Sequence, residues 1–362
     1  MAAISLLLSA CGGAAAPASS AVPASAAAFI KPAASAAASA KPAASGSAAA
    51  SAVPIPAPKP GTITVAVVGG SPSFTPFYVG VDNGLFDKYG APIQLVLMQG
   101  APPAMAAILT GEVQVAMEGG ALVGADITGQ KLAFIGALQN GFNQFVAYVK
   151  PNIKSLADLK GKTLAVGSPA SSATVAFETM VKSAGLNPKT DVKWIYAGTP
   201  AAEWAALSNN QVDGATLVWP YYLQAKQQGF VAIGDGKEMK IPGASLTVGV
   251  QREWVKNNPK LVDGLLRALS ESVFLANNDK DKVIAATRKH FDVSDQAQLD
   301  DVWTRFSGTF PSPPYITREA VEEAITDDPN PGNKQRKPED FIDNAPLDAL
   351  VASGFTKQFE KK

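Results

Sequence analysis

The stretch that decides the fold is Gly161–Gly185, which reads GKTLAVGSPASSATVAFETMVKSAG. Residues 163–166 are short and mainly apolar, so they predict a β-strand. A turn of small residues follows, and apolar side chains then recur at helical spacing from Val175 to Val181. A strand, a small-residue turn and a helix form a ligand cradle, because the first backbone N–H groups of a helix have no partner within it.

Three serines lie in this turn, at positions Ser168, Ser171 and Ser172. Their hydroxyls can cap the following helix, which is the ordinary role of serine at such a position. They can equally hold the polar head group of a small ligand without any charged side chain. The turn by itself leaves both interpretations open.

Composition limits the classes of function. A chain of 362 residues has room for about two domains. Basic and acidic residues balance at 31 each, so no overall field attracts nucleic acid or acidic lipid. The single cysteine, Cys11, and the single histidine, His290, exclude a disulfide framework and a multi-histidine metal centre. We therefore expect no metal, no cofactor and no nucleic-acid partner. Nothing after Leu8 approaches the roughly 18 consecutive apolar residues that span a bilayer.

The first 60 residues fall into two parts. Residues 1–11 are a short apolar run that ends Leu-Ser-Ala-Cys and resembles the lipobox of bacterial lipoproteins, so Cys11 is expected to carry a lipid. No basic residue precedes the run, so the leader is short or begins upstream of Met1. Residues 12–60 are almost entirely Ala, Ser, Pro and Gly, and they contain too few large apolar residues to fold. They predict a disordered tether with a reach of roughly 35–40 Å.

From Gly61 onward, predicted strands alternate with predicted helices, which indicates an α/β architecture around a mainly parallel sheet. The strands of the first block are expected at residues 62–68, 93–98, 111–117, 132–138 and 145–150, with helices at 74–84 and 101–109. Residues 246–250 form a strand without a neighbouring partner, so we expect it to return the chain to the first block. From Arg252 to Phe306 the pattern is helical, and a short helix is expected at 347–353.

The pattern starts again about a hundred residues later. Gly61–Val67 is echoed by residues 161–166, and each is followed by Gly-Ser-Pro; Leu109–Ala116 is echoed by Leu207–Ala215. We infer two similar lobes with mixed, mainly parallel sheets flanked by helices, joined by a hinge that the chain crosses near Tyr148 and near Ser245. The expected boundaries are 61–147 for the first part of lobe one, 148–245 for lobe two, and 246–362 for the return to lobe one and the C-terminal helices.

Taken together, residues 61–355 resemble the substrate-binding proteins of ATP-driven importers, in the type II periplasmic-binding fold. Within that fold they are most similar to the group for nitrate, aliphatic sulfonates, taurine and thiamine-pyrimidine precursors. The matching segments, in order, are Pro76–Gly80, Asn83–Phe86, Leu109–Val113, Leu156–Lys162, Gly185–Pro188, Gln211–Ala215 and Trp219-Pro220. The resemblance implies an extracytoplasmic protein that closes on a small solute, and the lipobox at Cys11 adds the expectation of a lipid anchor. We expect the protein to be a monomer. The resemblance also implies delivery of that solute to a membrane permease driven by a separate ATPase.

Open α/β sheets bind ligands at the carboxyl ends of their strands, so the turns there define the predicted site. Lobe one is expected to contribute Ser71, Ser73, Phe74, Glu118, Gly119, Gly120 and Asn140. Lobe two is expected to contribute Ser168, Ser171, Ser172, Trp219 and Tyr221. Trp219 is equally compatible with a core position beside Pro220, and Asp213 is interpreted as a structural turn residue.

No arginine falls in these turns, which argues against a bidentate guanidinium clamp on the ligand. An anion would rest on helix N-termini and serine hydroxyls, with Glu118 facing a ligand amine. The residues favour an organic sulfonate or a similar small anion or zwitterion. The alternative is a neutral aromatic nitrogen heterocycle, such as a thiamine-pyrimidine precursor, against Phe74, Trp219 and Tyr221. Enzyme relatives of the family carry a cysteine-rich motif that is missing here, and His290 lies in a surface-like helix, so no enzymatic activity is expected.

Overall fold

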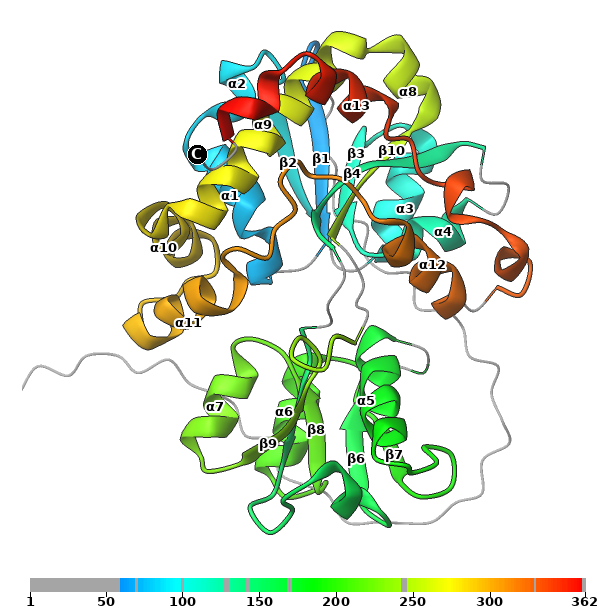
Figure 1. Cartoon of the computed structure of the whole chain (residues 1–362), viewed down its shortest axis with the longest axis vertical. Coiled ribbons are helices and arrows are strands. Elements are labelled where there is room, and N and C mark those ends of the chain that lie inside the picture. Colours follow the sequence, from blue (N-terminus) through cyan, green and yellow to red (C-terminus); the bar gives the residue numbers. More distant parts are fainter. Residues whose placement is uncertain are drawn as a thin grey trace, which may run out of the picture. The chain divides into compact units, whose positions relative to one another are not determined.

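A computed structural model describes residues 59–68, 71–98, 101–126, 130–140, 144–167, 169, 171–241, 246–328 and 330–359. In these residues the strands form two five-stranded sheets (Figure 1). The first sheet has the order β2 (Ile93–Met98), β1 (Ile63–Val68), β3 (Val115–Glu118), β10 (Leu246–Gln251) and β4 (Leu132–Gln139). The second has the order β7 (Lys193–Tyr196), β6 (Thr163–Val166), β8 (Gly214–Leu217), β5 (Val146–Val149) and β9 (Val231–Asp235).

The two sheets have the same topology, which confirms the internal repeat. In the first, β1 pairs in parallel with β2 and β3, and β10 runs antiparallel between β3 and β4. In the second, β6 pairs in parallel with β7 and β8, and β5 runs antiparallel between β8 and β9. The antiparallel strand of each sheet is the one that follows a crossing from the other sheet. The predicted fold class, two similar α/β lobes with mixed sheets, is therefore confirmed.

Helices cover both faces of the first sheet because its strands alternate their apolar side chains. Ile63 and Val65 of β1 point into the core under α1 (Thr75–Asp82) and α9 (Pro259–Asn278). Ala66 points to the opposite face, under α3, α4 and α12 (Figure 1). The remaining helices of this lobe are α2 (Leu85–Lys88), α3 (Ala101–Thr110), α4 (Ala121–Ala125), α8 (Arg252–Asn257), α10 (Lys280–His290), α11 (Gln296–Phe306), α12 (Arg318–Asp327) and α13 (Ala345–Ala352). Short 3₁₀ turns are η1 (Pro72–Phe74), η3 (Asn333–Gln335), η4 (Pro338–Asp340) and η5 (Phe355–Phe359).

The second sheet is covered in the same way. On one face Leu164 and Val166 of β6 pack with Phe177 of α5 (Ser172–Ser183). On the other face Ala215 and Leu217 of β8 pack under α6 and α7. This lobe also contains α6 (Pro200–Ser208), α7 (Tyr221–Gln227) and the 3₁₀ turn η2 (Leu156–Leu159).

The structure moves one predicted lobe boundary. A crossing was expected near Tyr148, with residues up to 147 in lobe one, but β5 pairs over its whole length with β8 and β9 of the second sheet. The first crossing therefore lies between Gln139 and Val146. Sequence patterning misplaced it because β5 is an apolar strand that fits either sheet. The predicted return of residues 246–250 to the first sheet is confirmed by the pairing of β10 with β3 and β4. Ser245, where the second crossing was expected, lies outside the described residues.

Gly264 allows α9 to lie against the chain between α2 and β2. A Cβ atom at this position would lie 2.4 Å from the carbonyl oxygen of Tyr89 and 3.0 Å from Cβ of Ala91. We expect Gly264→Ala to lower the free energy of unfolding by about 1–3 kcal/mol, because the backbone oxygen cannot rotate away. The same exchange in an open helix stabilises by about 1 kcal/mol. Urea unfolding would measure the effect, and a variant at least as stable as the natural protein would contradict this close approach.

Two further observations bear on function. Among the helices that the structure describes, none combines the length and apolarity that a membrane span requires. Within the same residues, no three His, Cys, Asp or Glu side chains gather closely enough to hold a metal ion. The predicted leader, the lipid-bearing Cys11 and the predicted tether of residues 12–60, except its last two residues, lie outside the described residues.

Candidate functional site

The candidate site comprises the turns after β1, β3, β4, β6 and β8, all at carboxyl ends of strands. After β1, the hydroxyl of Ser71 caps η1 by accepting a hydrogen bond from the backbone N of Ser73 at 3.3 Å. It also donates to the hydroxyl of Ser73 at 3.2 Å. Phe74 is buried in the core of lobe one. The neighbouring Thr75, which sequence reasoning missed, is fully buried, and its hydroxyl has no partner among the described residues.

Glu118, the last residue of β3, is only 3 % exposed. Its carboxylate accepts hydrogen bonds from the backbone N atoms of Ala121 at 3.3 Å and Leu122 at 3.1 Å, so it caps α4. Burial raises the pKa of Glu118 to about 8. These hydrogen bonds give Glu118 a structural role as the cap of α4. Its expected contact with a ligand amine stays a prediction.

The other lobe-one turn residues also have structural partners. The hydroxyl of Thr247 on β10 donates to the carbonyl oxygen of Gly119 at 3.3 Å. A Cβ atom on Gly120 would lie 2.6 Å from Cβ of Ala324, so this glycine lets α12 approach α4. The side-chain amide of Asn140 donates to the carbonyl oxygen of Tyr315 and accepts from the backbone N of Thr317 at 3.3 Å. Asn140 thereby fastens the end of β4 to the segment that enters α12.

In lobe two, Ser171 is the N-cap of α5. Its hydroxyl accepts from the backbone N of Thr174 at 3.4 Å and lies 3.1 Å from the hydroxyl of Thr174. The capping interpretation is therefore confirmed for Ser171, and its contact with a ligand stays a prediction. Ser168 and the side chain of Ser172 lie outside the described residues.

Trp219 follows β8 and is 7 % exposed, so the structure shows the core position that the sequence had left open, and its contact with a ligand stays a prediction. Its indole contacts Phe291 edge-on with the ring centroids 6.0 Å apart, and Phe291 in turn contacts Tyr78 of α1 edge-on at 5.6 Å. This tryptophan of lobe two therefore reaches the helical face of lobe one. Its Nε1–H is buried and has no acceptor among the described residues. Tyr221, the first residue of α7, is half-buried beside the same core.

A second buried acid in lobe two was missed by sequence reasoning. Glu203 on α6 is 1 % exposed, and its carboxylate accepts a hydrogen bond from the hydroxyl of Thr216 at 3.2 Å. Burial raises the pKa of Glu203 to about 8. The sequence carries no signal for this burial, since a glutamate in the first turn of a helix is normally a solvated residue that favours the helix dipole.

Two expectations about other residues are now decided. Asp213 accepts hydrogen bonds from the backbone N of Thr163 at 3.0 Å and from Nζ of Lys150 at 3.1 Å, so its structural interpretation is confirmed. His290 lies in the surface helix region that was expected, since its neighbours Arg288 and Lys289 on α10 are exposed. Its ring stacks on Tyr78 with centroids 4.0 Å apart, and its Nε2 lies 2.9 Å from a carboxylate oxygen of Asp82.

The described groups of this site suit an oxygen-rich anion. The indole N–H of Trp219 can only donate a hydrogen bond, so a ligand that bonds to it has to supply an acceptor. The hydroxyl of Thr75 and the N-terminus of α5 are further donors. With pKa values of about 8, Glu118 and Glu203 are mainly protonated at neutral pH and place little negative charge nearby.

Two lobes of one topology, each with small-residue turns at the carboxyl ends of its strands, define the class of two-lobed α/β proteins with the periplasmic-binding fold. The family model described as NMT1/THI5 like matches residues 71–282, which is more than half of the chain. The chain belongs to the NMT1/THI5-like family. A comparison with curated proteins found no matching sequence.

Three proteins with solved structures are similar in fold to this chain. The aliphatic sulphonate binding protein SsuA of Escherichia coli superposes with a TM-score of 0.60 at 22 % identity, over 74 % of this chain and 86 % of that one. The periplasmic nitrate-binding protein NrtA of Synechocystis PCC 6803 superposes with a TM-score of 0.62 at 14 % identity, and the match covers 82 % of this chain and 90 % of that one. The desulfurization enzyme DSZB, in the structure of a mutant in complex with biphenyl-2-sulfinic acid, superposes with a TM-score of 0.62 at 14 % identity. That match covers 80 % of this chain and 99 % of that one. At these identities the likeness shows the fold.

Proposed function

We propose that this protein is an extracytoplasmic solute-binding protein that delivers a small organic oxyanion, of the sulfonate or taurine type, to an ATP-driven importer. The observation that carries the proposal is the buried Nε1–H of Trp219, which has no acceptor among the described residues and lies where lobe two meets lobe one through Phe291. A buried donor without a partner costs free energy, and a ligand oxygen would remove that cost.

The structural relatives support an oxyanion. The names of the three proteins compared above mention a sulphonate, nitrate and a sulfinic acid, and each of these compounds carries oxygen atoms that can accept hydrogen bonds. The heterocycle alternative needs an open aromatic face. Trp219 is instead packed against Phe291, and Phe74 is buried in the lobe-one core, which favours the anion.

A binding role fits the described residues better than catalysis. The described hydroxyls of the site, those of Ser71 and Ser171, bond to the hydroxyls of Ser73 and Thr174, which are not the activating bases that a nucleophile needs. Ligand-driven closure follows if the solute touches both lobes, since it then binds the closed state more tightly and shifts the population toward it. Lipid attachment at Cys11 through the tether, a monomeric state and docking to a permease complete the proposal.

Calorimetry on the full chain tests the ligand class. We expect heat of binding with taurine, ethanesulfonate or nitrate, together with a raised melting temperature, because a ligand that binds only the folded state stabilises it. An aminopyrimidine serves as the probe of the alternative. Binding of the aminopyrimidine without binding of any oxyanion would overturn the proposed ligand class.

A further inference from the structure

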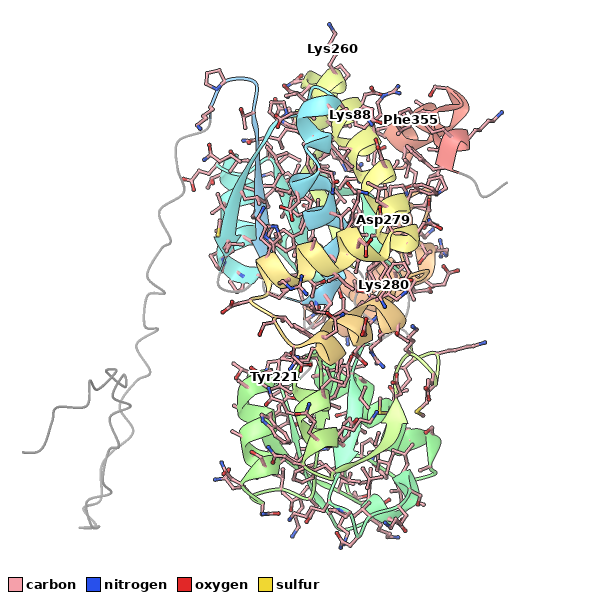
Figure 2. The ribbon with its side chains drawn as sticks, turned by 90° about the vertical axis from the view of Figure 1, so that its left-hand side faces the viewer. Lys88, Tyr221, Lys260, Asp279, Lys280 and Phe355 are labelled. Carbon is pink, nitrogen blue, oxygen red and sulfur yellow. The ribbon has the colours of Figure 1, made fainter. Side chains whose placement is uncertain are left out.

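A cavity lies on lobe one where three segments that are far apart in the sequence meet. Helix α9 forms one wall, the chain that follows α11 forms the second, and η5 forms the third. Figure 2 shows α9 between Lys260 and Asp279, with η5 beginning at Phe355 alongside it. The cavity has a volume of about 390 Å³, and none of the described residues that line it belongs to the turns of the candidate site. It is therefore a separate feature of the molecule.

Hydrogen bonds and ring contacts hold the walls of this cavity in place. The side-chain carbonyl oxygen of Asn277 on α9 accepts from the backbone N of Gly308 at 2.8 Å and of Phe310 at 3.4 Å. The amide of the same side chain donates to the carbonyl oxygen of Phe310 at 2.9 Å. At the start of η5, the guanidinium of Arg267 lies 4.5 Å from the ring centroid of Phe355. A ligand therefore meets walls that are already ordered, which lowers the entropy cost of binding.

The lining combines an aromatic wall with polar groups and carries no charge. The aromatic wall consists of Phe274 on α9 and Phe359 on η5, whose ring centroids are 5.4 Å apart and whose planes are inclined by 32°. Both phenylalanines are partly exposed. Within the described part of the chain, none of the lining residues is acidic, basic or a histidine. The cavity therefore favours a neutral ligand, because a charged one would lose hydration without gaining a counter-charge.

Hydroxyl groups determine what such a ligand has to supply. Thr356 lines the cavity and is only 5 % exposed, and its hydroxyl has no hydrogen-bond partner in the residues that the structure describes. Ser270 is 2 % exposed, and its hydroxyl donates to the carbonyl oxygen of Leu266 at 2.7 Å, so it can only accept a further hydrogen bond. One free hydroxyl and one acceptor are matched by ligand groups that both donate and accept, as alcohol hydroxyls do.

We propose that this cavity binds an uncharged ring compound with several hydroxyl groups, such as a hexose. The faces of such a ring consist of C–H groups, which pack against the aromatic wall. Its hydroxyls lie at the ring edge, where they donate to Ser270 and exchange hydrogen bonds with Thr356. The bound ring connects α9 with η5 and so holds the C-terminal segment against lobe one. The inference goes beyond the proposed oxyanion function and does not depend on it.

Saturation-transfer NMR on the full chain tests this site. The probes are D-glucose, D-galactose, D-mannose and myo-inositol, with phenol as the probe for a purely aromatic ligand. We expect C–H protons of at least one sugar or of the inositol to receive saturation from the protein. An excess of taurine should leave that signal unchanged, because the oxyanion site is elsewhere. Hydrogen exchange of the peptide that spans residues 353–359 should slow about threefold or more when the binding compound saturates the protein.

Two variants locate the binding compound in the cavity. Thr356→Val keeps the shape of the side chain and removes only its hydroxyl, so it should weaken binding about two- to tenfold. Phe359→Leu removes half of the aromatic wall and should weaken binding by a similar factor. The matched control is Thr326→Val, which removes an exposed hydroxyl on α12 and should leave binding unchanged.

Three outcomes would overturn the proposal. The first is that no sugar and no inositol receives saturation from the protein. The second is natural affinity in folded Thr356→Val and Phe359→Leu proteins, which would place the compound elsewhere. The third is binding of phenol without binding of any sugar or inositol, which would remove the ligand class. Failure to bind oxyanions would leave all of these readouts unaffected.

Discussion

The folded protein is expected to lose several kcal/mol of stability when the pH is raised from about 5 to about 9. The cause is a pair of buried carboxyl groups, one in each lobe. Glu118 is 3 % exposed and Glu203 is 1 % exposed, and burial raises the pKa of each from 4.5 to about 8. Both values lie in the range where pH is easily varied, so the effect is open to direct measurement.

The sign follows from where each state releases its proton. Above pH 4.5 the unfolded chain loses the proton of such a glutamate, while the folded protein keeps it up to about pH 8. The stability that each buried carboxyl group contributes is therefore fully present below the pKa of the unfolded chain, and it is lost as the pH rises through the pKa of the folded protein. The free energy of unfolding falls by at most about 1.4 kcal/mol per pH unit for each group, so the loss over the whole range is on the order of 4 kcal/mol per carboxyl group.

Urea unfolding at stepped pH would check this for the natural protein, Glu118→Gln and Glu203→Gln. Each amide is neutral at every pH, so each variant should lose about half of the pH dependence between pH 5 and pH 8. Asp213→Asn is the matched control, because the Asp213 carboxylate is partly exposed and held by Lys150. An unchanged pH profile in both glutamine variants would show that neither carboxyl holds its proton in the folded state.

Trp219→Phe is expected to weaken oxyanion binding about 10- to 100-fold, because a hydrogen bond to a charged group contributes about 1.5–3 kcal/mol. Phenylalanine keeps an aromatic ring against Phe291 and removes only the unpaired Nε1–H. The measurement is calorimetric titration with the sulfonate that binds the natural protein. This prediction rests on the proposed function, and it separates the indole donor from the packing of its ring.

Two variants complete this comparison. Ser171→Ala should cost about 1 kcal/mol of stability through loss of the α5 cap, and its effect on affinity reports whether that hydroxyl also meets the ligand. Trp204→Phe exchanges another buried tryptophan of lobe two, which packs edge-on against Phe230, and should leave affinity unchanged. Natural affinity in Trp219→Phe would remove the indole N–H from the site.

Much of the fold could be read from local patterns. The strands at residues 93–98 and 163–166 have the predicted limits, because short β-branched and apolar runs between turns have few other arrangements. The repeat beginning at Gly61 and Gly161 led to two lobes of one topology, which the pairing of β1 and β6 confirms. The first crossing was predicted a few residues too late in the chain, because the sequence of β5 does not indicate which of the two sheets it joins.

The site was less accessible to such reasoning. The sequence placed Glu118, Asn140 and Ser171 at the correct strand ends, but it could not show that their side chains are already engaged by α4, by the segment before α12 and by α5. It also gave no signal for the burial of Glu203 or for the pairing of Arg305 with Asp235. Partners of this kind are supplied by segments far away along the chain.

The sequence by itself determined the alternation of strands and helices, the two-lobed repeat and the chemistry of the turns, because these depend on side-chain periodicity and on residues close together in the chain. Only the tertiary structure decided which polar groups are buried, which are paired and which are left free. Arg305 meets Asp235 across 70 positions of sequence, and the indole of Trp219 meets Phe291 of the other lobe. Burial and pairing determine the pKa values of the carboxyl groups and which donors stay unpaired. Both depend on which groups are close in space, and the separation along the chain does not reveal this.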